Sequence, residues 1–257
     1  PLVAVEARWT TESNGTAAYE ALSDGADLDG DGYEDWVFGD INADKTATND
    51  GEVYVLWGQP SEYSAVASTF KSTAESVVSG EASSDYVGTI AGALPDTDGD
   101  GKGELFFWHG ADGDLGIVRG SAAMKGGGAI LASEADTLID FSTSAKPTVA
   151  RATADLDSDG LLDIFFGVES SGGRVYVFPG DISGAIEDDD VLASVKGSST
   201  DGSVYFSHAM PHRQADLDDD GALDVVLTDY GYNGDVDGNG SADTNAGAVY
   251  MFLSSDR

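Results

Sequence analysis

A nine-residue acidic pattern, D-x-D-x-D-G-x-x-D, recurs along the chain at long and nearly regular intervals. The copies are "DLDGDGYED" at 27–35 (loop 1), "DTDGDGKGE" at 96–104 (loop 2), "DLDSDGLLD" at 155–163 (loop 3) and "DLDDDGALD" at 216–224 (loop 4). Their first aspartates stand 69, 59 and 61 residues apart. A period of this length predicts a fold built from repeated structural units, which constrains the architecture more than any other feature of the sequence.

Short β-branched and aromatic segments surround each loop. "DWVFGD", "ELFFWHG", "DIFFGV" and "DVVLTD" follow the loops, and "GEVYVLWG", "DLGIVRG", "GRVYVFPG" and "GAVYMFLS" come later in each repeat. A weaker, small-residue segment precedes each loop, and a more polar candidate strand lies between repeats. Sustained helical periodicity is missing from the sequence. The pattern therefore predicts units of four antiparallel strands, which is typical of β-propeller blades.

We predict an all-β chain that forms a single β-propeller domain over residues 1–257. Its four blades are expected at about 12–80, 81–142, 143–198 and 199–257. The last repeat stops after its third strand, and residues 1–11 include "LVAVEARWT", which is similar to the missing fourth strand. Pairing of these residues with the last blade would close the ring. The alternative is an open fragment of a larger ring, completed by another chain because open edge strands associate.

The spacing within the loops is the one that hard cations need. Aspartates at positions one, three and five, with a carboxylate at position nine, converge on one point, and Gly at position six allows the tight turn. With the backbone carbonyl of position seven this gives about six or seven oxygen ligands, which suits Ca²⁺ better than Mg²⁺. The predicted ligands are Asp27, Asp29, Asp31 and Asp35; Asp96, Asp98, Asp100 and Glu104; Asp155, Asp157, Asp159 and Asp163; and Asp216, Asp218, Asp220 and Asp224.

The second half of each loop departs from an EF-hand, in which position twelve is a Glu followed by a helix. Here position twelve is apolar and lies inside a predicted strand, as Phe38, Phe107, Phe166 and Leu227. The ion is therefore expected to hold a strand-to-strand turn. An ordinary Asp/Gly turn is the alternative for one such loop, but four loops in register, each followed by an apolar strand, argue against it.

These units resemble the FG-GAP repeat of integrin α-subunit-like propellers. The shared features are the small-residue first strand, the acidic loop, a strand ending near "FG" and a later "G-x-V-Y-V" strand. The resemblance covers nearly the whole chain, although repeat two has Glu104 at position nine and "DLGIVRG" in the third strand. It implies a propeller with Ca²⁺ between the first and second strands of each blade. Family propellers usually have seven blades, so four repeats are a departure. The resemblance also implies a position-seven carbonyl ligand in each loop, namely those of Tyr33, Lys102, Leu161 and Ala222.

A fifth loop, "DVDGNGSAD" at 235–243 (loop 5), satisfies the same pattern at a different place in the repeat. Its predicted ligands are Asp235, Asp237, Asn239, Ser241 and Asp243. It lies between the second and third strands of repeat four, so it should emerge on the face opposite the other loops. A shorter insertion in repeat one, "DINADKTATND", holds only a partial ligand set, which comprises Asp40, Asn42 and Asp44.

The formal net charge of −35 excludes nucleic acids and anionic membranes as partners. The ligand positions of the loops account for 19 of the 47 acidic residues, and the other 28 still outnumber the 12 Lys and Arg. An acidic surface of the halophile type therefore remains an alternative for part of this charge. Cysteine is absent, which excludes disulfides and thiolate chemistry.

The chain begins with Pro rather than Met, so we expect a processed or excised piece without its secretion signal.

Loops on a rigid scaffold usually carry binding, and in the family the face opposite the calcium loops binds the ligand. We therefore expect loop 5, with Tyr230 and Tyr232, to contribute to a partner surface; a metal-held loop without a partner is the alternative. His212 and Arg213 form a basic cluster on an inner strand, where they could hold an anion or a sugar. The sequence contains no serine-protease-like triad order, P-loop or His-rich metal spacing, so we do not expect an enzyme.

The sequence thus favours an extracellular calcium-stabilised binding or adhesion module with four or five Ca²⁺ ions and a protein or glycan ligand at a cell surface or matrix. A lectin-like propeller is one alternative, although Trp9, Trp36, Trp57 and Trp108 do not occupy one equivalent position. A structural subunit of a surface fibre, completed by a neighbouring chain, is another. A Ca²⁺-dependent polysaccharide lyase or hydrolase is the least favoured.

Overall fold

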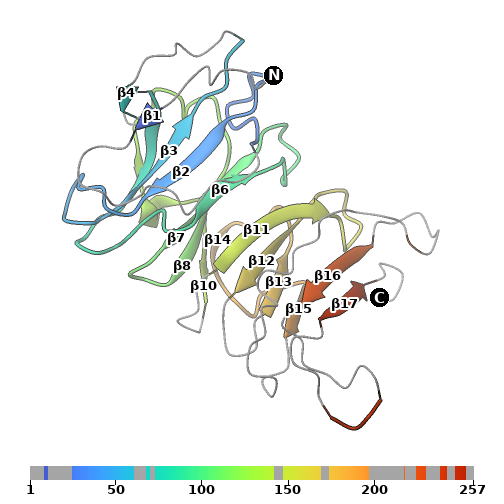
Figure 1. Ribbon diagram of the computed structural model, residues 1–257. Coiled ribbons are helices and arrows are strands. Elements are labelled where there is room, and N and C mark those ends of the chain that lie inside the picture. Colours follow the sequence, from blue (N-terminus) through green and yellow to red (C-terminus); the bar gives the residue numbers. More distant parts are fainter. Residues whose placement is uncertain are drawn as a thin grey trace, which may run out of the picture. The chain divides into compact units, whose positions relative to one another are not determined.

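The computed structural model is all-β in the residues that it describes, with strands and one short 3-10 helix, η2 (Ala132–Glu134) (Figure 1). The described residues are 9–10, 25–60, 68–69, 73–141, 147–168, 174–196, 217, 224–229, 238–241 and 247–252. The chain divides into two compact units. Unit 1 comprises Pro1–Asp96 and Asp100–Leu138, and unit 2 comprises Thr97–Gly99 and Ile139–Arg257.

The first sheet of unit 1 contains three strands of repeat one and one short strand of repeat two. Its order is β2 (Trp36–Asp40), β3 (Glu52–Leu56), β5 (Glu75–Ser79) and β9 (Ile130–Leu131). The first three strands pair antiparallel, and β9 adds in parallel at the edge. All five residues of β3 are buried, as expected for an interior strand that is covered on both faces.

Repeat two supplies the second set of strands in unit 1. β6 (Ala91–Leu94), β7 (Glu104–His109) and β8 (Asp114–Val118) form an antiparallel meander. β10 (Thr137–Asp140) follows β8 in strand order, and the boundary between the two units falls within it. All six residues of β7 are buried, so its run of apolar side chains fills the interior on both faces of the strand.

Unit 2 contains the strands of repeats three and four. β11 (Pro147–Ala154), β12 (Asp163–Val168), β13 (Arg174–Phe178) and β15 (Ala193–Lys196) form a four-stranded antiparallel sheet in that order. β14 (Gly184–Glu187) lies between β13 and β15 in the chain. β16 (Val225–Asp229) and β17 (Ala248–Phe252) pair antiparallel.

The second and third strands predicted for every repeat are present. They are β2 and β3, β7 and β8, β12 and β13, and β16 and β17. The predicted small-residue first strand is found as β6 and β11 in repeats two and three, whereas in repeat one the described part is a single bridge between Ala26 and Asp35. The prediction of an all-β chain with antiparallel sheets is confirmed. The closed four-bladed ring stays a prediction.

The described part of the predicted closing strand pairs elsewhere. β1 (Trp9–Thr10) pairs in parallel with β4 (Ser68–Thr69), which belongs to repeat one. Residues 1–8 lie outside the described residues. The expected pairing of residues 1–11 with the last blade is therefore not found for Trp9 and Thr10.

A close backbone approach explains one glycine of the "FG" signature in repeat one. A Cβ atom on Gly39 of β2 would lie 1.8 Å from the carbonyl oxygen of Gly88. The neighbouring core combines apolar residues of both repeats, including Val53, Val87 and Phe107. Only glycine allows β2 to pack so closely on the segment that precedes β6.

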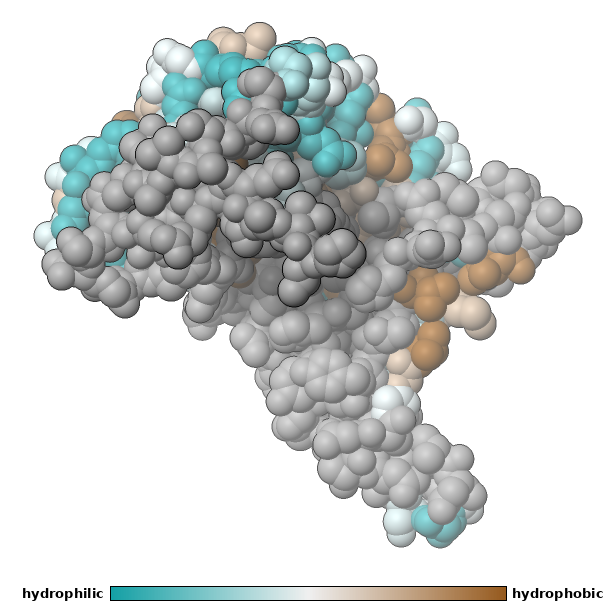
Figure 2. Space-filling view, turned by 45° about the horizontal axis from the view of Figure 1, so that its top comes forward, coloured by the Kyte–Doolittle hydropathy of each residue, from teal (hydrophilic) through white to brown (hydrophobic). Residues whose placement is uncertain are grey.

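The surface is mainly polar where it is described. On the face drawn in Figure 2, the residues coloured for hydropathy are largely hydrophilic, with a few separate hydrophobic patches. Large hydrophobic side chains that are exposed include Val249 and Met251 of β17. A search of the described residues finds no helix with the length and hydropathy needed to cross a bilayer.

Candidate metal centres

The acidic loops share one backbone conformation at positions four and six. Both positions have positive φ in every loop whose fourth to seventh residues are described. The pairs are Gly30 and Gly32 (77° and 90°), Gly99 and Gly101 (80° and 88°), Ser158 and Gly160 (64° and 96°), and Gly238 and Gly240 (74° and 85°). The left-handed turn that Gly at position six was expected to provide is therefore present in loops 1, 2, 3 and 5.

Position five closes the turn in each of these loops. Its side-chain oxygen accepts a hydrogen bond from the backbone N–H of position seven. The donor and acceptor pairs are Tyr33 N and Asp31 Oδ1 (3.0 Å), Lys102 N and Asp100 Oδ1 (2.8 Å), Leu161 N and Asp159 Oδ1 (2.8 Å), and Ser241 N and Asn239 Oδ1 (2.8 Å). The described part of loop 5 thus adopts the same local geometry as loops 1, 2 and 3, although loop 5 lies at another place in its repeat.

The aspartate at position one organises the first half of the turn. In loop 1, Asp27 Oδ1 accepts hydrogen bonds from Gly30 N (2.8 Å) and Asp31 N (3.0 Å), and Asp27 Oδ2 accepts one from Gly32 N (2.8 Å). The same bond from the position-six N–H reaches Asp96 Oδ2 in loop 2 and Asp155 Oδ2 in loop 3, at 2.9 Å in both. The carboxylate is therefore fixed in orientation by its own loop.

The acid at position nine is buried and ties the two ends of the loop together. Its Oδ2 accepts the backbone N–H of position two, from Leu28 to Asp35 (2.8 Å), Leu156 to Asp163 (2.5 Å) and Leu217 to Asp224 (2.6 Å). Asp35 Oδ1 also accepts Gly58 N at the end of β3 (2.7 Å). Position nine therefore joins the loop, the strand that follows it and, in repeat one, the end of the third strand.

Carboxylate oxygens of positions one, three and nine converge in the first three loops. In each group one oxygen per residue lies within 4.8 Å of the others. The groups are Asp27, Asp29 and Asp35; Asp96, Asp98 and Glu104; and Asp155, Asp157 and Asp163. Three oxygen donors at this separation fit a hard divalent cation. Position five, which the sequence also predicts as a ligand, is not in these three groups.

Loop 3 also contains a buried polar atom that its own turn does not satisfy. Asp163 is fully buried, and its Oδ1 has no hydrogen-bond partner among the described residues. Burial raises the pKa of Asp163 to about 6, and the charges of Asp157 and Asp155 add to this, while the N–H of Leu156 opposes it. Burial likewise raises the pKa of Asp35. A cation at this point would satisfy the buried oxygen and offset the cost of burying the charge.

A lysine that the sequence did not single out lies on loop 1. Lys125 Nζ is 2.7 Å from Asp29 Oδ2 and 3.1 Å from Asp31 Oδ2. The hydrogen bond from Lys125 is the main reason why the pKa of Asp31 lies below its usual value. The ammonium also lies 5.5 Å from the centre of the Trp57 ring. A divalent cation in loop 1 would have to compete with this group for two of the predicted ligands.

Lys125 lies 94 residues after Asp31 in the chain, so local sequence patterns cannot predict this contact. Gly126 N donates to Glu75 Oε1 (2.7 Å), and Trp57 Nε1 donates to Glu75 Oε2 (2.7 Å), which fixes the segment that carries the lysine.

Loop 2 has a lysine contact of its own, in which Lys102 Nζ binds Asp100 Oδ2 at 2.7 Å. This contact lowers the pKa of Asp100.

Adjacent loops contact each other through their backbones. Gly103 N of loop 2 donates to the carbonyl oxygen of Asp27 in loop 1 (2.8 Å). A Cβ atom on Gly120, at the end of "GIVRG", would lie 2.1 Å from the Gly103 oxygen and 2.7 Å from the Leu28 oxygen. The glycine after the third strand of repeat two therefore packs against position two of loop 1 as well as against its own loop.

The same contact recurs one repeat later. A Cβ atom on Gly180, after β13, would lie 2.3 Å from the oxygen of Thr97 and 2.4 Å from that of Leu162. Thr97 Oγ1 donates to the Gly180 oxygen at 3.0 Å. Thr97 is position two of loop 2, as Leu28 is of loop 1, so the repeats contact one another with the same geometry.

Most of the hydrogen bonds that side chains accept in the insertion of repeat one go to an aspartate outside the predicted partial ligand set. Asp50, which is fully buried, accepts hydrogen bonds from the backbone of Lys45, Thr46 and Ala47 and from Thr46 Oγ1. Burial alone would raise the pKa of Asp50, but these bonds outweigh it and lower the pKa. Asp44 Oδ1 accepts Asn49 N at 2.6 Å. Asp40 Oδ1 accepts Asn42 N at 3.1 Å. The side chains of Asp40 and Asp44 thus each accept a backbone hydrogen bond within the loop, and Asp50 accepts four hydrogen bonds in all.

Several predicted site residues lie outside the described residues. They are Asp216, Asp218, Asp220 and Ala222 of loop 4, Asp235, Asp237 and Asp243 of loop 5, and Tyr230, Tyr232, His212 and Arg213. For these positions the metal and partner assignments stay predictions. No protein-family model matches the chain, and no curated protein matches it.

Proposed function

We propose that this chain is a calcium-stabilised, non-catalytic binding module made of FG-GAP-like β-propeller blades. The observation that carries the proposal is the repetition of one loop geometry. Positions four and six are left-handed, position five accepts the N–H of position seven, and oxygens of positions one, three and nine converge within 4.8 Å. Chance Asp/Gly turns would not repeat these features together at a period of about sixty residues.

The loops would act as clamps between strands. When bound, Ca²⁺ would supply charge neutralisation for carboxylates that the fold has already brought together. Position one orients the turn, position nine links it to the following strand, and the Asp27–Gly103 backbone bond connects it to the next loop. Calcium binding at one loop is therefore expected to stabilise the strands on both sides of it.

The arrangement of strands supports the blade interpretation. Repeat three forms a four-stranded antiparallel meander, and repeat two has the same order through β6, β7 and β8. Equivalent glycines after the third strand, Gly120 and Gly180, pack on position two of the preceding loop. A constant contact between successive units is what a propeller or another repeat architecture requires.

We place the partner surface on the loops that join second and third strands. In unit 1 these are the insertion after β2 and the turn after β7, with the segment 81–88 between them. Ser84 N donates to Thr48 O (2.9 Å), Tyr86 N to Asn49 O (3.2 Å) and Ala111 N to Asp85 O (3.2 Å), so the three segments form one connected surface. Loop 5 occupies the equivalent connection in repeat four. A protein or glycan at an extracellular surface is the expected ligand.

Calcium stoichiometry, measured together with thermal melts, tests the proposal. Titration of the calcium-free protein with Ca²⁺ should give four or five bound ions per chain. Removal of calcium with a chelator should lower the melting temperature. Asp155→Asn should remove one ion, whereas Asp189→Asn, at an exposed acid outside the loops, should leave the stoichiometry unchanged. Absence of calcium binding, or equal losses in both variants, would reject the metal clamp and with it the proposed function.

A further inference from the structure

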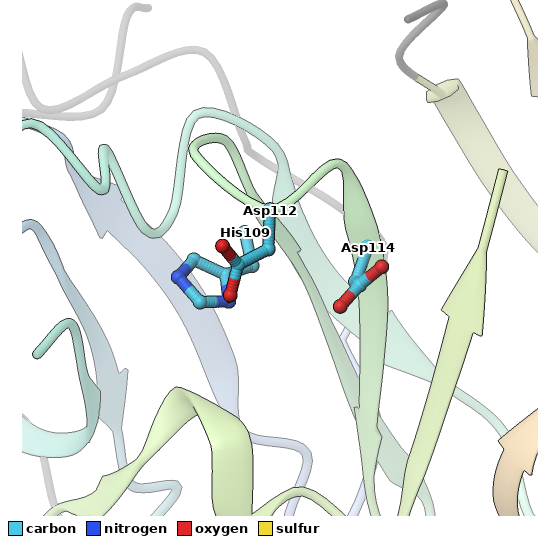
Figure 3. Close-up of side chains that lie close together, drawn as sticks. All are labelled: His109, Asp112 and Asp114. Carbon is cyan, nitrogen blue, oxygen red and sulfur yellow. The ribbon is translucent and has the colours of Figure 1, made fainter. Parts of the chain in front are cut away.

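A histidine and two aspartates meet at the end of a hairpin that is separate from the acidic loops. His109 ends β7, Asp114 begins β8, and the two residues are directly paired across the hairpin. The turn between them is closed by Gly113 N, which donates to His109 O (3.0 Å), and Gly113 has φ of 83°. Figure 3 shows the imidazole of His109 beside the carboxylate of Asp112, with Asp114 on the neighbouring strand.

The three side chains offer donor atoms at metal-binding separation. One ligand atom from each lies within 4.8 Å of the other two. His109 Nδ1 is 3.6 Å from Asp112 Oδ2, a gap too long for a good hydrogen bond. The side chain of His109 is 3% exposed and that of Asp112 is 65% exposed, so the group is rigid on one side and open to solvent on the other.

The other nitrogen of His109 gives a second, independent indication. His109 Nε2 is buried and has no hydrogen-bond partner among the described residues, although it faces Asp85 Oδ2 at 3.6 Å. Asp85 is buried as well, and its Oδ2 accepts Glu81 N and Ala82 N at 2.7 Å each. Histidines that bind a metal usually direct the other ring N–H to a carboxylate. Asp85 Oδ2 is the carboxylate oxygen that Nε2 faces, and the 3.6 Å gap would have to shorten on metal binding for a hydrogen bond to form.

We propose that His109, Asp112 and Asp114 form a binding site for a divalent transition-metal ion such as Zn²⁺. His109 Nδ1 and one oxygen of each aspartate would be the ligands, and Asp85 would orient the ring through Nε2–H. The nitrogen donor distinguishes this site from the oxygen-only loops, because imidazole favours Zn²⁺ and similar ions over Ca²⁺. Three protein ligands leave a coordination position for water or for a donor group of a bound partner.

Zn²⁺ titration of the full chain in excess calcium tests this site without depending on the loops. One Zn²⁺ per chain should bind and should not be displaced by calcium. Asp112→Asn, at an exposed position that folding does not require, should weaken Zn²⁺ binding at least about 10-fold, and Asp85→Asn should weaken it by a similar factor. Asp136→Asn, another aspartate of unit 1, serves as the matched control and should bind Zn²⁺ as the unmodified chain does.

Imidazole nitrogen shifts in NMR spectra identify the histidine, since the chain has only three. Zn²⁺ should move one imidazole signal, and His109→Gln should remove that signal. Three outcomes would overturn the proposal: no binding in excess calcium, binding that Asp112→Asn leaves unchanged, or an equal loss in Asp136→Asn. An equal loss in Asp136→Asn would indicate that Zn²⁺ binds weakly to surface carboxylates in general.

Discussion

At the scale of single residues, the acid at position nine is a buried part of the fold as well as a predicted metal ligand. Asp163 is fully buried with one oxygen bound to Leu156 N and the other without a hydrogen bond among the described residues. Without a cation, burial favours the protonated form and raises the pKa of this carboxyl to about 6. We therefore expect the residue to destabilise the calcium-free protein at neutral pH and, if Ca²⁺ binds as proposed, to stabilise the calcium-bound protein.

This raised pKa predicts a pH dependence in the chelated protein. The carboxyl binds protons more tightly in the folded state than in the unfolded chain, where its pKa is near 3.8. The free energy of unfolding should therefore fall as the pH rises from about 4 to about 6, by at most about 3 kcal/mol from this group. Asp163→Asn should remove that part of the slope and should be more stable than the unmodified chain at pH 7 in chelator.

Urea unfolding at pH 4.5 and pH 7, with chelator and with calcium, measures the effect. In calcium the order should reverse, because the variant loses a ligand that the unmodified chain uses. The same pH slope in Asp163→Asn and in the unmodified chain would show that Asp163 is not the titrating group.

Lys125 gives a second prediction at this scale. Its ammonium repels a cation in loop 1 and competes for Asp29 and Asp31, so Lys125→Met should tighten calcium binding at one site by about 3- to 10-fold. In chelator the same variant should melt at a lower temperature, because the carboxylates lose their counter-charge. Calorimetric titration measures the affinity, and Lys196→Met, at an exposed lysine of unit 2, is the control. Unchanged affinity would mean that the ammonium does not compete with the cation.

At the scale of elements, the loops depend on two left-handed residues each. Three of the four described loops use glycine at position four, whereas loop 3 has Ser158 at φ of 64°. A side chain in this region costs about 1–2 kcal/mol relative to the right-handed one, and glycine avoids that cost. Loop 3 therefore carries backbone strain that the other described loops do not.

Ser158→Gly should therefore stabilise the protein, by about 0.5 kcal/mol after the larger entropy of the unfolded chain is counted. Gly160→Ala, two residues on at φ of 96°, should destabilise it by about 1 kcal/mol although no atom lies within 4 Å of the added Cβ. Denaturant unfolding in calcium compares the pair. Equal effects of the two changes would show that the loop relaxes to another conformation and that position six needs no glycine.

At the scale of the whole molecule, charge and calcium act together. Five divalent ions would cancel ten of the 35 excess negative charges, so a strongly acidic surface remains after the loops are filled. Self-repulsion of this surface destabilises the compact state and is screened by salt. The proposed calcium sites and the acidic surface would thus contribute separately to stability and respond to different conditions.

Melts in chelator with increasing NaCl separate these contributions. Salt should raise the melting temperature gradually, while millimolar calcium at low salt should raise it by more than about 10 °C if four sites are well occupied. If molar NaCl in chelator restored the full melting temperature, the acidity would be explained by a halophile-type surface and the clamps would add little. MgCl₂ at the same ionic strength is the control for divalent screening.

Local patterns in the sequence were enough to predict the repeat and the strands that follow each loop. The sequence also predicts that positions one, three, five and nine converge, and the structure groups the oxygens of one, three and nine in loops 1, 2 and 3. The loops and strands depend on residues less than ten positions apart, so local spacing with β-propensity is enough to predict them. The repeat is found because this local pattern recurs along the chain. The sequence also identified loop 5, whose described residues have the same turn as Gly30 to Tyr33. These turns could be predicted because their hydrogen bonds join residues that are close in the sequence.

Only the tertiary structure brought Lys125 to loop 1, Asp85 to His109 and Gly120 to Leu28. These pairs are separated by many residues, and no periodic pattern marks one member for the other. It also paired Trp9 with Ser68, because strand pairing depends on which edge is available after the sheets have packed. Contacts between residues far apart in the sequence depend on how whole sheets pack together. The spacing of residues within a loop or strand does not contain that information.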